Sequence, residues 1–243
     1  MPDSAVPFRR PDLLRLDYDT YRALPAVANS DLSRLRDALD GRPPRPQTSS
    51  NEGALSFGTA FHTALLEPAD YVAGQPGLND TLVWWLVDGV KLNAQLAELL
   101  SLGTPETSVL FTEPVTDTLC KLRADLVVDH PDQPFTIIDF KTTMARDADH
   151  FLWQCSAYDY DRQAAFYTDA LQAERFLLVG VQKVEPFSVF TIEVSEQMLA
   201  EGRTKYQRLL RLLKAPATAP AYRADAVQAA VDALGLHSQD SDA

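Results

Sequence analysis

The chain places an acid and an amine two residues apart at the end of a short apolar run, with a second acid fourteen positions upstream. The run covers residues 135–141 and contains Asp139 and Lys141, and the upstream acid is Asp125. Residues i and i+2 of a strand project from one face, so a strand here would direct Asp139 and Lys141 together. Two carboxylates are hard ligands for a divalent cation such as Mg²⁺, and an ammonium can hold a water or a phosphate oxygen. The pattern is typical of metal-dependent phosphodiester hydrolysis.

Each part of this pattern has a simpler interpretation. Asp125 interrupts a strand-like run, and a buried carboxylate without a partner is costly or takes up a proton. A metal shared with Asp139 would satisfy Asp125, but so would a salt bridge to Arg123 or a place at a strand end. The Asp-x-Lys triplet alone also occurs by chance at the ends of many strands.

Two helical segments add further candidates. His62 stands on a mostly apolar helix, where a single histidine is more often a hydrogen-bonded core residue than a ligand. Gln163 and Tyr167 are four residues apart, so a helix would present both on one face. An amide and a phenol together can hold a phosphate, a water or a metal-bound carboxylate. The same pair also fits the boundary of an ordinary amphipathic helix.

The composition favours one globular unit. A chain of 243 residues with 46% hydrophobic content can bury one sizeable core. We expect a single domain over residues 1–213, with residues 1–53 as an N-terminal helical and loop elaboration and residues 214–243 as a partly disordered tail. The apolar stretches are far shorter than the roughly 20 residues of a membrane span, and no secretory signal is visible. These features predict a cytoplasmic protein.

Charge and cysteine content restrict the partners. The formal net charge of −12 opposes indiscriminate coating of nucleic acid but permits a local basic channel. Two cysteines, Cys120 and Cys155, are too few for a disulfide framework or a four-thiolate zinc or iron-sulfur site, so we expect buried thiols and no iron-sulfur cluster. The candidate channel residues, each of which could also be an ordinary solvated charge, are Arg34, Arg36, Lys121, Arg123, Lys141, Arg146 and Arg162.

The periodicity of apolar residues predicts an α/β (α+β) fold with a central mixed β-sheet flanked by helices. A loop over residues 42–53 and a turn over residues 130–134 separate some of these elements, and the turn would join an antiparallel pair. The predicted helices cover residues 29–39, 54–66, 90–100, 156–173 and 195–213, with a weak helix over 224–234. The predicted strands cover residues 109–115, 119–128, 135–142, 176–184 and 188–194.

Taken in order, these features resemble the PD-(D/E)XK nuclease superfamily, and within it the RecE-type (exonuclease VIII-like) phage recombination exonucleases. The resemblance covers residues 18–213 and includes the N-terminal segment 21–32. It implies a restriction-endonuclease-like core. Its motifs are residues 57–62 ending in His62, then Asp125, then residues 138–141, then Gln163 and Tyr167.

The resemblance also implies roles for individual residues. Lys141 would be the catalytic lysine, and Gln163 and Tyr167 would line the site. The second acid of the motif is Asp139, where glutamate is common in the superfamily, but both offer the same ligand atoms. The ligands of Mg²⁺ or Mn²⁺ would be His62, Asp125, Asp139 and the main-chain carbonyl of Phe140.

By the same resemblance the substrate would be linear double-stranded DNA, digested from 5′ to 3′ to leave 3′ overhangs for a single-strand annealing protein. Such enzymes tend to form closed homo-oligomeric rings, which would reconcile an acidic exterior with a basic bore. Three alternatives remain. The chain could be an inactive DNA-end-binding scaffold or a structure-specific endonuclease, or residues 135–141 could be an ordinary strand end in a small-molecule enzyme.

Overall fold

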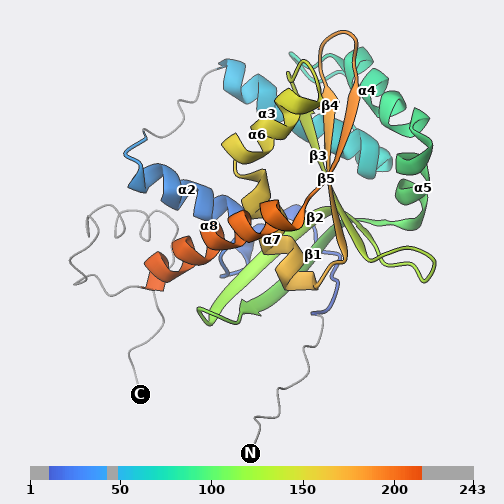
Figure 1. Ribbon diagram of the computed structural model, residues 1–243. Helices are drawn as coiled ribbons and strands as arrows, with labels where there is room; N and C mark the ends of the chain where they lie inside the picture. Colours follow the sequence, from blue (N-terminus) through green and yellow to red (C-terminus); the bar gives the residue numbers. More distant parts are fainter. Residues whose placement is uncertain (1–10, 43–48, 215–243) are drawn as a thin grey trace, which may run out of the picture.

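A five-stranded mixed sheet forms the centre of the protein. Figure 1 shows its place among the helices in a computed structural model that describes residues 11–42 and 49–214. Neighbouring strands are antiparallel except for the central parallel pair β3 and β4. The predicted mixed sheet flanked by helices is therefore confirmed, as is the antiparallel pairing across the turn at 130–134. In sheet order the strands are β1 (Thr104–Glu113), β2 (Thr118–Val128), β3 (Thr136–Thr143), β4 (Arg175–Gln182) and β5 (Val189–Glu193).

Helices cover both faces of the sheet. None of them, within the part of the chain that the structure describes, is long and apolar enough to cross a membrane. The predicted helix over 224–234 and most of the predicted tail lie outside the described residues. The α-helices are α1 (Tyr18–Ala23), α2 (Asn29–Leu39), α3 (Ser49–Leu66), α4 (Asp80–Leu92), α5 (Ala94–Leu102), α6 (Ala148–Ala157), α7 (Tyr160–Leu171) and α8 (Glu196–Lys214).

The two faces of the sheet carry separate hydrophobic cores. One core joins the sheet to α2, α6, α7 and α8, and the other joins it to α3, α4 and α5. Side chains alternate between faces along a strand, so Ile137 lies in the first core and Ile138 in the second, and Leu178 and Leu177 divide in the same way. This double burial explains why β3 and β4 read as continuous apolar runs.

Three predicted helices were wrong in their extent. The predicted helix 156–173 is two helices, α6 and α7, separated at Asp159, whose φ of 58° lies in the left-handed region. The predicted helix 90–100 is replaced by α4 and α5, and the side chains of Asn79 and Asn93 cap their first turns by accepting backbone N–H bonds. Helix α3 also begins at residue 49, inside the predicted loop, and α1 was not predicted.

Gly202 allows α8 to pack closely on α7. A Cβ added there would lie 2.1 Å from the carbonyl oxygen of Asp161, far inside van der Waals contact. Gly202→Ala should therefore push the helices apart and lower the free energy of unfolding by about 2–3 kcal/mol in urea titrations. Gly89→Ala on α4 is the control, because the nearest atom to its added Cβ is 3.9 Å away. It should be neutral or stabilise by up to about 1 kcal/mol, and equal losses in both variants would contradict the prediction.

Candidate active site

Three acidic residues lie next to one another across three strands. The register of β1 on β2 places Glu106 opposite Asp125, and the register of β2 on β3, continued by one residue, places Asp125 beside Asp139. In a regular strand, residues three apart lie on opposite faces of the sheet. Ala124 and Val127 of β2 nevertheless both lie in the first core, so the alternation of side chains shifts by one residue between them. Glu106 has a left-handed φ of 49°. The irregularity turns the acids of β1 and β2 away from either core and into a cavity.

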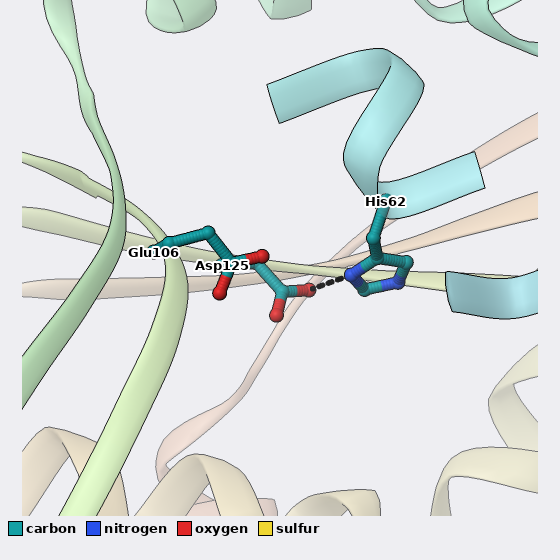
Figure 2. A group of neighbouring side chains, drawn as sticks. All are labelled: His62, Glu106 and Asp125. Carbon is teal, nitrogen blue, oxygen red and sulfur yellow. Dashed lines mark ion pairs between the residues drawn. The ribbon is translucent and has the colours of Figure 1, made fainter. Parts of the chain in front are cut away.

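His62 on α3 completes a cluster with two of these acids. Figure 2 shows its imidazole directed at Asp125, with Glu106 beside it. One ligand atom from each of the three side chains lies within 4.8 Å of the others. The distance from His62 Nδ1 to Asp125 Oδ2 is 3.5 Å, and His62 Nε2 lies 2.9 Å from the carbonyl oxygen of Phe140. The N–H of Phe140 donates to Asp125 Oδ2 at 2.8 Å, so Phe140 links histidine and acid through its main chain.

The electrostatics of this cluster fit a bound cation. Burial, and then the Lys141 ammonium, lower the pKa of His62, so its imidazole is neutral at pH 7. In the neutral tautomer that donates Nε2–H to the Phe140 carbonyl, His62 Nδ1 carries a lone pair that faces Asp125 Oδ2. Two facing acceptors repel each other unless a proton or a metal lies between them. Burial, and then the charge of Asp139, raise the pKa of Asp125 to about 8. A set of one imidazole and two carboxylates suits Mg²⁺ or Mn²⁺.

Asp139 and Lys141 project from the same face of β3, as the i, i+2 spacing predicted. Lys141 Nζ lies 2.5 Å from Asp139 Oδ2, and Gln163 Nε2 of α7 donates to Asp139 Oδ1 at 2.5 Å. Only 1% of the Asp139 side chain is exposed, so its charge depends on these partners. Tyr167, one turn further along α7, donates its hydroxyl proton to the carbonyl of Arg123 at 3.1 Å.

The Lys141 side chain is held as a cation. Burial alone would lower the pKa of its ammonium, but the carboxylates of Asp139 and Asp125 together raise it above the ordinary value. The ring of Tyr160 also lies under Lys141 Nζ, 5.1 Å from nitrogen to ring centroid, which favours the charged form. Tyr160 was not singled out in the sequence. In the metal-free site, these contacts therefore favour the ammonium form of Lys141, which donates hydrogen bonds.

Two of the predicted channel residues point into the protein, which corrects the prediction for them. The buried ammonium of Lys121 donates to the main-chain carbonyls of Tyr21, Arg22 and Leu24 at 2.7–3.2 Å, and so closes the end of α1. Only 1% of the Arg162 side chain is exposed, and its guanidinium bonds to side chains of α2 and to Asp159. Lys121 therefore faces no channel, and Arg162 lines a cavity only with a guanidinium that already has protein partners.

The other predicted cations differ in position. Arg123 lines the same cavity as His62 but is held by Glu106 at 2.6 Å. The contacts of Asp125 are instead with His62 and with the N–H of Phe140, and among the described residues no ion pair joins it to Arg123. Arg146 is 81% exposed and pairs only loosely with its neighbour Asp147 at 3.2 Å. The remaining two, Arg34 and Arg36, form ion pairs with acids of α2, and Arg36 also contacts Asp159.

Glu106 is the residue of the cluster that sequence reasoning missed. The available signal was a charged residue directly after Pro105 at the start of an apolar strand. Charged side chains are common on edge strands such as β1, so this signal alone does not single out a site. Only the pairing of β1 with β2 places Glu106 next to Asp125, where burial and the Asp125 charge raise its pKa.

One cavity of about 650 Å³ collects these groups. Its lining includes His62, Glu106, Asp125, Asp139 and Lys141, and also Gln163 and Tyr167 of α7.

The family described as PDDEXK-like domain of unknown function (DUF3799) matches residues 86–220, more than half of the chain. The chain belongs to this PDDEXK-like family. The matched span of this PDDEXK-like protein contains the three acids and the lysine, whereas His62 lies before it and is supplied by α3.

Two solved structures match this chain over most of their lengths. A protein of Eubacterium rectale assigned as an exonuclease is 16% identical with a TM-score of 0.57, over 82% of this chain and 86% of that one. A phage-related exonuclease of Haemophilus somnus 129PT is 14% identical with a TM-score of 0.39, over 84% of this chain and 93% of that one. No curated protein matches the sequence. At these identities a likeness concerns the fold alone, and the first structure, with its TM-score of 0.57, is the one that supports it.

Proposed function

We propose that this PDDEXK-like protein is a metal-dependent exodeoxyribonuclease that hydrolyses linear double-stranded DNA from its ends. The observation that carries the proposal is the convergence, in one cavity, of a three-ligand cluster and a buried Asp139–Lys141 pair. His62 and Asp125 of the expected ligand set, with Glu106 added to them, would hold Mg²⁺ or Mn²⁺. The other two expected ligands have protein partners: Asp139 contacts Lys141 and Gln163, and the Phe140 carbonyl contacts His62. A bound divalent cation lowers the pKa of a coordinated water and neutralises charge on the phosphate.

The side chains around the proposed metal site have distinct roles. The Lys141 ammonium donates hydrogen bonds to the attacking water or to a phosphate oxygen, because its charged form is favoured in the site. Asp139 fixes the ammonium and keeps it charged, and Gln163 fixes Asp139 by donating to its other carboxylate oxygen. Positioned donors of this kind stabilise the charge that develops on a phosphate during hydrolysis.

The finer features are proposals that rest on the resemblance to RecE-type exonucleases. They are 5′ to 3′ polarity, 3′ overhangs for a single-strand annealing protein, and a homo-oligomeric ring. The net charge of −12 opposes general coating of DNA, so contact with DNA would depend on local cations such as the exposed Arg146. Sedimentation of the full chain with and without DNA would test the ring.

The reaction is tested with end-labelled linear duplex, closed circular duplex and single-stranded DNA, each with Mn²⁺, Mg²⁺ or EDTA. We expect metal-dependent digestion of the linear duplex only, with loss of a 5′ label before a 3′ label. Nicking of circles would identify an endonuclease instead. Binding of ends without digestion would identify a scaffold, and neither binding nor digestion would favour a small-molecule enzyme.

A further inference from the structure

A second cavity lies beside the catalytic one. Its volume is about 670 Å³, and Tyr21, Ser30, Gln163 and Tyr167 line both cavities. Gln163 holds the catalytic Asp139, so the two cavities meet directly at the proposed reaction centre. A ligand held at Lys141 therefore has room to continue into the second cavity.

A short series of aromatic rings leads from the catalytic lysine into this space. The Tyr160 ring lies 5.1 Å from Lys141 Nζ, and the Tyr158 ring lies 5.9 Å from that of Tyr160. Tyr158 is 53% exposed and lines the second cavity. The break between α6 and α7 creates this arrangement, because the left-handed Asp159 separates the two tyrosines. Asp159 is fixed by Arg162 at 3.0 Å and by Lys205 at 3.0 Å.

The charges around the second cavity argue against a phosphate as its ligand. Arg162 is the one cation among the described residues that line it, and its guanidinium is already bonded to Asp159, Asn29 and Ser33. The first turn of α2 also reaches the cavity, but Asp31, which is paired with Arg34, already accepts the N–H of Ala28 at 2.7 Å and places a carboxylate there. The lining is thus polar, aromatic and nearly neutral, which suits a flat heterocycle with hydrogen-bonding edges.

We propose that the second cavity binds an unpaired nucleotide of the strand being cut, with its base stacked on Tyr158. The assignment of that strand rests on the proposed nuclease function. Aromatic side chains stack on any base, so the site would be tolerant of sequence. The hydroxyl of Ser30, on the wall that the two cavities share, would face the base or the sugar. A duplex would then have to separate at least one terminal base pair before its phosphate reaches Lys141.

The test measures binding of a short single-stranded oligonucleotide with a terminal 2-aminopurine, to the full chain in EDTA, by fluorescence quenching. Tyr158→Phe keeps the ring and should bind as the wild type does. Tyr158→Ala should bind about 10-fold or more weakly and lose the quenching, the effect of losing one base–aromatic stack. Trp153→Ala is the matched control, because Trp153 is 63% exposed on the neighbouring turns of α6 but lines neither cavity. It should bind normally.

The outcomes separate this proposal from the nuclease function. Tyr158→Ala binding that equals the wild type, or an equal loss in Trp153→Ala, would overturn the stacking site even if digestion is observed. Tyr158-dependent quenching in a protein that digests no DNA would support the stacking site and overturn only the nuclease. With active enzyme, ends carrying one unpaired terminal base should be digested faster than blunt ends, and Tyr158→Ala should reduce that difference.

Discussion

Lys141→Ala should lower the rate of DNA hydrolysis by about 10²–10³-fold. The lysine is the one cation that the structure places on Asp139 at the centre of the described cavity, and a positioned donor to developing negative charge typically contributes 10²–10³. Lys141→Arg keeps the charge but not the geometry of the ammonium, so it should retain a small part of the rate. The measurement is the initial rate of release of labelled nucleotides from linear duplex at saturating Mn²⁺.

The alanine variant also removes the counter-charge of a carboxylate that is 1% exposed, so stability must be measured beside activity. We expect a loss in the free energy of unfolding of about 1–3 kcal/mol, the cost of leaving a buried charge partly unpaired. Lys91→Ala, at an exposed position of α4, should change neither quantity. A folded Lys141→Ala protein that digests DNA at more than a tenth of the wild-type rate would exclude the assigned role of the lysine.

The parts of the fold that could be predicted from sequence are those that local patterns determine. Strands β3 and β4 are buried on both faces, and their apolar runs are unmistakable. The break at Asp159 could not be predicted in the same way. Its left-handed conformation is held by Arg36 and Lys205, which come from α2 and α8 and lie far away in the sequence. No local signal distinguishes such a residue from another helical aspartate.

The same limit applies to the site. Asp139, Lys141 and Asp125 could be found because a polar residue inside an apolar strand is conspicuous. Lys121 resembles any surface lysine in the sequence, and its burial depends on carbonyls of α1 about a hundred residues away. Glu106 becomes a candidate ligand only through strand pairing and a left-handed φ. Long-range contacts therefore decide which charged residues belong to the site.

Asp125→Asn should weaken Mn²⁺ binding by about 100-fold or more. The amide keeps the shape of the side chain and can still accept the N–H of Phe140, but it removes one of the two carboxylates that face His62. A metal must also displace the proton of Asp125, whose pKa is about 8, so affinity in the wild type should rise from pH 6.5 to pH 8. Isothermal titration calorimetry in buffers of different ionisation enthalpy would measure both the affinity and the proton release, and Asp125→Asn should lose the proton release.

The raised pKa of Asp125 has the opposite effect on the metal-free protein. Between the unfolded pKa, near 4, and the folded value of about 8, the folded state holds one more proton than the unfolded state, so the free energy of unfolding falls as pH rises. His62 has a lowered pKa and contributes the reverse slope, which fades as pH rises past the unfolded value of about 6.5. From pH 6.5 to 8 the wild type in EDTA should therefore lose about 1–2 kcal/mol. Asp125→Asn should lose much less of its free energy of unfolding over the same pH range, as measured by urea titrations. If the two proteins instead show parallel pH profiles, Asp125 does not hold the extra proton. The argument that this site is built for a cation would then fail as well.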